Sequence, residues 1–306
     1  MTVGTIDRPM PVALGKSCYS WAMSLRSTLL AEGPGWSATD VVCTARPGDP
    51  TYEERYETAC IAAVMEGTFQ HRSPRGAVTL APGALLLGNH GEAFECGHEH
   101  GAGDRCLAFN FDPAHLERTA AGVPGAKGAR FKASRVPPVE VLLPLIVAAE
   151  AAREEHDGAT LEELALRIAG TAIALADDAL PVRAAPSARD ERRVSEAVRL
   201  IEEGVGKAQS LASLASDVAM SPYHFLRTFR ALVGMTPHQY VLRTRLHRAA
   251  VRLKRSDDPV SAIAFEEGFG DLSTFNRRFK RVMGKTPLAY RARAPGRACD
   301  VSQART

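Results

Sequence analysis

Hydrophobic and polar positions follow two different spacings along the chain. From residue 52 to residue 111, short apolar runs recur about every 8 to 12 residues, and turn signals such as Pro74 and Gly76 separate them. Residues 60–65 are apolar throughout, which predicts a strand buried on both faces. The residues before 52 are weakly patterned and predict an irregular arm followed by one early strand. The spacing of the apolar runs over 52–111 is typical of a small antiparallel barrel or sandwich. It predicts further strands at 67–72, 77–80, 84–87, 93–96 and 106–111.

Apolar residues with helical spacing begin near residue 139. They recur three or four positions apart over 139–155, directly after two prolines, which are tolerated at a helix start. Residues 160–163 (TLEE) have the form of a capping box and predict a second helix that ends near residue 178. These two helices must bury their apolar stripes either on the barrel or in a dimer interface. The unpatterned segment 181–190, rich in proline and alanine, is predicted to be a linker.

The last hundred residues contain an internal repeat with an offset of 50 positions. Each unit begins at a residue that can cap a helix, Ser221 or Asp271. Each helix is predicted to end at a glycine in the left-handed conformation. The identical positions are Phe225/Phe275, Arg227/Arg277, Phe229/Phe279, Gly234/Gly284, Thr236/Thr286, Pro237/Pro287 and Tyr240/Tyr290.

Each unit of the repeat predicts a helix-turn-helix. Short amphipathic segments at 211–218 and 260–267 precede the capped helices, whose outer faces are basic and could enter a major groove. Residues 237–254 are predicted to form one continuous helix, about 27 Å long at the usual rise per residue. A rod of this length could hold two recognition helices roughly one DNA turn apart, so one chain could read two successive major grooves.

Charge is divided unevenly along the 306 residues, a length that fits two domains. Residues 190–293 hold 19 Lys and Arg against 11 Asp and Glu, whereas residues 1–189 hold 17 against 23. We therefore expect only the basic C-terminal part to meet a polyanion. The six cysteines form no CxxC pair, which indicates reduced thiols. No signal-peptide-like or membrane-length apolar run is present, so a cytoplasmic protein without membrane contact is expected.

The second unit of the repeat carries a recognisable signature. It comprises Ile263-Ala264, Gly268-Phe269, Asp271, Ser273, Phe275, Arg277, Phe279-Lys280, Gly284, Thr286-Pro287 and Tyr290-Arg291. Together with the first unit it resembles the C-terminal domain of the AraC/XylS transcription regulators, over residues 192–293. The resemblance implies a cupin-like sensor or dimerisation domain ahead of the DNA-binding module.

The resemblance also implies which side chains read bases. In the first recognition helix these are Tyr223, His224 and Arg227, and in the second they are Ser273, Thr274, Asn276 and Arg277. The two arginines suit bidentate contacts to guanine, and the asparagine suits adenine. Three further basic residues are better placed for phosphates, which position the protein without specifying sequence: Arg230, Lys280 and Arg281.

A second candidate site lies in the N-terminal half, in the segment from Phe94 to Cys106. If 94–100 is a strand, Cys96, His98 and His100 share one face, and Cys106 joins them if a hairpin pairs residues with an even index sum. These ligands suit zinc or another transition metal such as copper. The His-x-His pattern resembles metal-binding cupins, although Asp104 stands where their glutamate is expected. Ordinary core residues, a metal site and a thiol-based redox sensor are the three interpretations.

These patterns together predict an α+β fold with two domains: a cupin-like β-barrel followed by two helices, and an all-α domain with two helix-turn-helix units joined by a long helix. The predicted limits are 1–180, a linker at 181–190, 191–293, and a flexible tail at 294–306. The predicted function is a sequence-specific transcription regulator, not an enzyme. It is expected to be a homodimer that binds double-stranded promoter DNA, could contact RNA polymerase and responds to an unidentified effector. The alternative is a metal-dependent cupin enzyme with an appended DNA-binding module.

Overall fold

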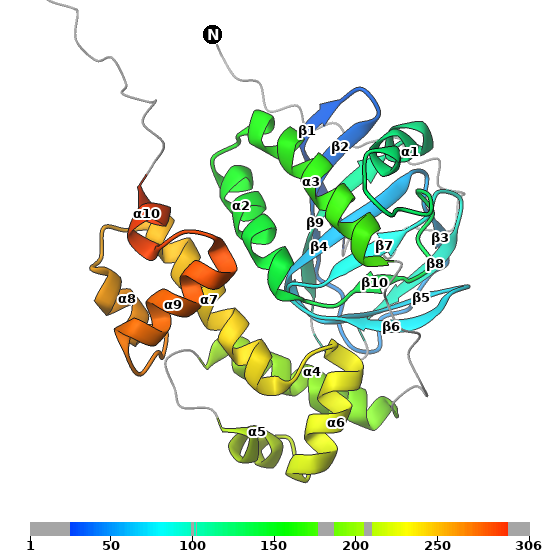
Figure 1. Cartoon of the computed structure of the whole chain (residues 1–306). Helices are drawn as coiled ribbons and strands as arrows, with labels where there is room; N and C mark the ends of the chain where they lie inside the picture. The colour runs from blue at the N-terminus through cyan, green and yellow to red at the C-terminus, as the bar shows by residue number, and fades with distance from the viewer. Residues whose placement is uncertain (1–24, 99–100, 102, 177–186, 205–209, 293–306) are drawn as a thin grey trace, which may run out of the picture.

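The computed structural model describes residues 25–98, 101, 103–176, 187–204 and 210–292. It divides into a β-rich N-terminal part and an all-helical C-terminal part, as expected (Figure 1). The irregular arm, His100, most of the proposed linker and the proposed tail lie outside the described residues. No helix in the described ranges is both long and apolar enough to span a bilayer.

Two antiparallel sheets make up the N-terminal domain. The larger has the strand order β1-β2-β9-β4-β7-β10, and the smaller has the order β3-β8-β5-β6. Strand β4 is central and its first six residues are buried, as the apolar run predicts. The strands are β1 (Leu25–Gly33), β2 (Trp36–Cys43), β3 (Glu54–Arg55), β4 (Ala59–Gly67), β5 (Phe69–Ser73), β6 (Gly76–Leu80), β7 (Leu85–Gly88), β8 (Ala93–Gly97), β9 (Asp104–Phe111) and β10 (Arg135–Val136).

The structure corrects two features of the predicted strand pattern. The early region contains two long strands, β1 and β2, which form a hairpin around the glycines of 33–35. Strands β8 and β9 do not pair as the predicted hairpin, because β8 pairs with β5 in the smaller sheet and β9 lies between β2 and β4 in the larger. The chain crosses from the smaller sheet to the larger between β8 and β9. The even index sum of a hairpin therefore cannot be used to place Cys106 on the same face as Cys96 and His98.

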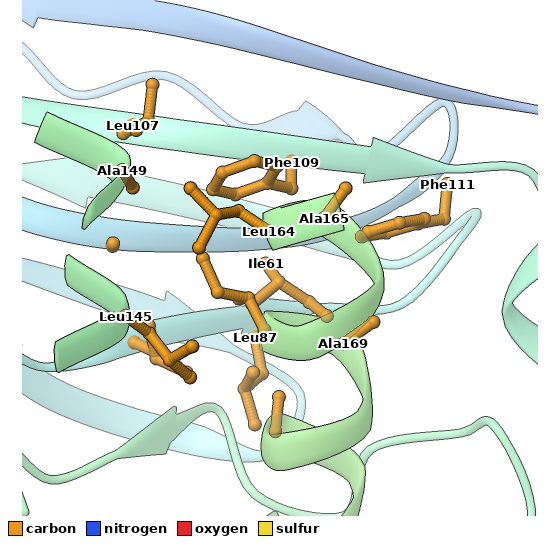
Figure 2. Packing of buried hydrophobic residues seen from close by; sticks show 14 of the residues in the cluster. Ile61, Leu87, Leu107, Phe109, Phe111, Leu145, Ala149, Leu164, Ala165 and Ala169 are labelled. Carbon is orange, nitrogen blue, oxygen red and sulfur yellow. The ribbon is translucent and has the colours of Figure 1, made fainter. Parts of the chain in front are cut away.

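Helices cover the outer face of the larger sheet. Side chains of β4 and β9, such as Ile61 and Phe109, pack against Leu145 and Leu164 from two helices in a continuous core (Figure 2). The first of these helices follows a short 3-10 turn, and the second begins earlier than predicted because Asp157 caps it through the backbone N–H of Thr160. The helical elements of this domain are α1 (Pro113–Ala121), η1 (Glu140–Leu142), α2 (Leu143–Glu154) and α3 (Gly158–Ala176).

The C-terminal domain reproduces the repeat as two similar units. Helices α6 and α9 each have 12 residues and end at glycines with φ of 91° and 73°. The connecting helix α7 has 19 residues and passes from one unit to the other (Figure 1). The helices are α4 (Ala188–Glu203), α5 (Leu211–Asp217), α6 (Pro222–Val233), α7 (Pro237–Arg255), α8 (Val260–Glu266), α9 (Leu272–Met283) and α10 (Pro287–Arg291).

The two domains share their hydrophobic clusters. Ala81, which follows β6, belongs to the core of the first helix-turn-helix unit. Leu143 and Val147 of α2 belong to the core of the second unit. At Gly83 the backbone has a φ of +89°, and a Cβ there would lie 1.9 Å from a guanidinium nitrogen of Arg243. The N-terminal domain therefore packs directly on both units of the repeat.

Candidate nucleic-acid interface

The first recognition helix, α6, is fixed by caps at both ends. The hydroxyl of Ser221 accepts from the backbone N–H of His224, and Gly234 closes the helix in the left-handed conformation. Phe225 and Phe229, four residues apart, are fully buried and in edge contact with each other. This packing fixes the orientation of the helix, so its opposite face is turned to solvent.

The exposed face of α6 carries most of the side chains predicted to meet DNA. Tyr223 is 76% exposed, and Arg227 and Arg230 are also exposed. His224 differs from these, because it is half-buried and its Nε2 lies 3.1 Å from a carboxylate oxygen of Asp190 in α4. This contact ties the start of α6 to α4.

The second recognition helix, α9, repeats this geometry. Asp271 accepts from the backbone N–H of Thr274 at 2.7 Å, and burial of Phe275 and Phe279 fixes the inner face. Among the predicted DNA contacts on α9, the exposed side chains are Ser273, Arg277, Lys280 and Arg281, and the half-buried ones are Thr274 and Asn276. The guanidinium of Arg281 donates to Glu140 of the N-terminal domain at 3.1 Å. The other predicted basic contacts on α9, Arg277 and Lys280, are exposed to solvent, on a helix whose apolar side is buried in the core.

The helix α7 connects the two units and lies partly in the core. Its N-cap Thr236 and Gln239 form the reciprocal hydrogen bonds of a capping box. Tyr240 is fully buried and donates to Glu202 of α4 at 2.8 Å. Arg243 of α7 is a charged residue, but its side chain is buried at 4% exposure, against Gly83 of the N-terminal domain. Sequence could not predict this burial, since the covering surface comes from a different domain.

Comparison with known proteins identifies this module. Residues 214–293 match the family model described as a helix-turn-helix domain. Over 86 residues the chain is 43% identical to the HTH-type transcriptional regulator Rv1931c of Mycobacterium tuberculosis, covering 28% of this chain and 33% of that protein. Over 98 residues it is 34% identical to a putative AraC-like transcription regulator of Streptomyces antibioticus, covering 32% of each. The C-terminal domain is of the AraC type.

A further relative extends the same finding. The chain is 37% identical over 90 residues to the probable transcriptional regulator LumQ of Photobacterium leiognathi, covering 29% of this chain and 36% of that protein. The matched stretch thus spans about a third of the length of each of these three relatives. These matches concern the AraC-type domain and leave the N-terminal domain to be interpreted from its own residues.

The Cys-His segment ahead of the AraC-type domain does not form the hairpin that the sequence predicts. Cys96 lies in β8, opposite His71 of β5, and Cys106 lies in β9, opposite Val41 of β2. His100 lies outside the described residues. Burial raises the pKa of the Cys96 and Cys106 thiols well above the usual value, and the carboxylate of Asp104 adds to the increase. Both thiols are therefore neutral at physiological pH in the structure as described.

His98 instead lies between Asp104 and Cys43, and no sequence pattern connects Cys43 with this segment. Its Nε2 is 2.5 Å from Asp104 Oδ2, and its Nδ1 is 4.0 Å from the Cys43 sulfur. Burial alone would lower the pKa of His98, but the hydrogen bonds with Asp104 and Cys43 outweigh it and raise the pKa to about 9. The Cys106 thiol donates to the other carboxylate oxygen of Asp104 at 3.4 Å.

Proposed function

We propose that this protein is a sequence-specific DNA-binding transcription regulator. The observation that supports this most directly is the pair of capped helices, α6 and α9, each held by two buried phenylalanines and each presenting an exposed arginine at the equivalent position. Equivalent positions on two copies of one motif are expected to make equivalent contacts. The matches of the AraC-type domain to transcription regulators support the same function.

In this proposal, Arg227 and Arg277 read guanine in two successive major grooves, each contributing about 1 to 3 kcal/mol of discrimination. Tyr223, Ser273 and Asn276 complete the base contacts. Arg230 and Lys280 bind phosphates, which adds affinity without specificity and makes binding weaken as salt rises. The remaining predicted contacts are His224 and Thr274, which are half-buried, and Arg281, which is exposed.

Three of these side chains already have hydrogen-bonding partners within the protein. The ring of His224 is already engaged by Asp190, and the guanidinium of Arg281 by Glu140. Either side chain reaches DNA by releasing this partner or by using another of its nitrogens. Thr274 donates its backbone N–H to the Asp271 cap, and its side chain also hydrogen-bonds that carboxylate, so its hydroxyl is engaged as well.

The N-terminal domain is assigned the role of sensing a signal or holding two copies together. The direct packing of α2 and of the β6–β7 segment on the AraC-type domain supports this role, because a change in either element would reach a recognition helix. The protein would then act as a cytoplasmic homodimer at a promoter, with RNA polymerase as a further partner. We assign no catalytic reaction to it.

The test begins by selecting bound fragments from a random DNA pool with the purified full-length protein. Binding of the selected sequence is then compared for wild type, Arg277→Ala and Arg167→Ala. The last removes an exposed arginine of α3 that forms an ion pair with Glu163, one helical turn away, so it controls for loss of one positive charge.

The Arg277→Ala protein should lose about 10-fold or more in affinity for the selected site and discriminate less at one base pair, whereas Arg167→Ala should bind like wild type. The proposal fails if no sequence is enriched, or if Arg277→Ala keeps both affinity and base preference.

A further inference from the structure

The strongest unassigned site lies where the two sheets of the N-terminal domain meet. Cys43 ends β2 and Asp104 begins β9, and these residues stand directly opposite each other in the ladder. His98 follows the last residue of β8 in the smaller sheet. Three segments that are distant in sequence therefore bring a thiol, an imidazole and a carboxyl group together.

These three residues offer donor atoms that all lie within 4.8 Å of one another. Zinc bound tetrahedrally, with bonds of about 2.0 to 2.3 Å, would place its ligand atoms roughly 3.3 to 3.6 Å apart. Asp104 now approaches Nε2 of His98 and Cys43 approaches Nδ1, so the imidazole ring must turn for one of its nitrogens to share an ion with both residues. A thiolate, an imidazole and a carboxylate are also the donor types that zinc accepts in proteins.

The backbone around the group is tightly held. Gly103 donates its N–H to the carbonyl of Ala45 at 2.8 Å, which anchors the segment before Asp104 to the segment after Cys43. A Cβ on Gly103 would lie 2.6 Å from the carbonyl oxygen of Cys43, and a Cβ on Gly67 would lie 2.3 Å from that of Gly103. Such close approach fixes the spacing between the Cys43 and Asp104 backbones before any ligand binds.

A neighbouring thiol further orients the carboxyl group. Cys106 donates to Oδ1 of Asp104 at 3.4 Å, which leaves Oδ2 directed at His98. Groups that hold a ligand side chain in this way are typical of protein metal sites. The group is also largely shielded from solvent, since His98 is 7% exposed and Cys43 is half-buried.

We propose that Cys43, His98 and Asp104 form a zinc-binding site, with the fourth position of the ion open to water or a small ligand. This ligand set differs from the one that the Cys-x-His-x-His segment suggests, because the thiol comes from β2 and neither Cys96 nor Cys106 binds the ion directly. The site does not depend on the proposed DNA binding, so either proposal can fail alone.

The test uses full-length protein that is stripped with a chelator, loaded with one equivalent of Zn²⁺ or Co²⁺ and then dialysed. Wild type is compared with Cys43→Ser, with Asp104→Asn and with Cys60→Ala. Cys60 is a buried thiol on β4 outside the group, so its replacement controls for loss of a core cysteine. Asp104→Asn keeps the size of the side chain and provides a second variant if Cys43→Ser folds poorly.

Wild type and Cys60→Ala should retain one zinc per chain, and the cobalt forms should absorb in the near ultraviolet through thiolate-to-metal charge transfer. Cys43→Ser should lose this band, and both ligand variants should bind zinc at least about 10-fold more weakly. Failure of wild type to retain zinc, or retention of the metal and the cobalt band by Cys43→Ser, would overturn the proposal. Zinc binding that survives in Asp104→Asn at wild-type affinity would overturn the assignment of the carboxylate.

Discussion

Replacement of Arg135 by methionine tests how the N-terminal domain holds the first recognition helix. The guanidinium of this β10 residue donates to the carbonyl of Thr79 at 2.6 Å, to that of Ala231 at 3.2 Å and to that of Leu232. The last two carbonyls belong to the final turn of α6, where the helix dipole favours a positive charge. Burial lowers the pKa of Arg135 to about 10, which leaves it charged at neutral pH.

The expected loss follows from these contacts. A hydrogen bond to a charged group contributes about 1.5 to 3 kcal/mol, but the three bonds are not additive and the exposed carbonyls can turn to water. Methionine retains the apolar stem of the side chain and removes every donor. We therefore expect Arg135→Met to lower the free energy of unfolding by about 2 to 4 kcal/mol.

The measurement is urea unfolding of the full chain, followed by circular dichroism. The matched control is Arg130→Met, which removes an exposed arginine from the preceding loop and should change stability by less than about 0.5 kcal/mol. If Arg135→Met were as stable as Arg130→Met, these three hydrogen bonds would not hold the domains together, and the reasoning would be refuted.

Two further predictions concern other contacts between the two domains. Gly83→Ala should lower the melting temperature well below that of Gly48→Ala, because both glycines have positive φ but only at Gly83 would the added Cβ meet Arg243; equal melting temperatures would contradict this. Burial alone would raise the pKa of Glu150, but its hydrogen bond with His247 and the charges of Arg255 and Arg153 outweigh it and lower the pKa. The ionised form therefore adds stability above about pH 4.5, its usual value, and this contribution is lost as the pH falls toward the lowered pKa. In acid unfolding followed by fluorescence, Glu150→Gln should respond less to pH below 4.5 than wild type, and parallel curves would disprove the assignment.

Features of the C-terminal domain could be predicted because they depend on residues close in sequence. Ser221 and Asp271 bond to a backbone N–H three residues ahead, and Gly234 and Gly284 end the helices that these residues begin. The repeat doubled the evidence for each feature. The lengths of α6, α7 and α9 followed from these local signals.

What could not be predicted depends on residues far apart in sequence. Whether β8 pairs with β9 is decided by competition among all strands, and no pattern within 93–111 reveals that they join different sheets. Cys43 and Asp104 become partners only through the β2–β9 ladder, so the local histidine pattern suggested a different set of ligands. In the same way, Arg243 is exposed on an isolated helix and becomes buried only when the other domain covers it.

The unbroken helix α7 limits how the relation between its two units can change. Each residue inserted into an α-helix advances it by about 1.5 Å and rotates everything beyond by about 100°. A single insertion would therefore turn α9 away from α2 and from any face it shares with α6. Seven residues, close to two full turns, would nearly restore the angle and lengthen the spacing by about 10 Å. The separation between α6 and α9 can thus change only in large discrete steps. Insertions in α7 therefore cannot adjust this architecture gradually to operators of different spacing.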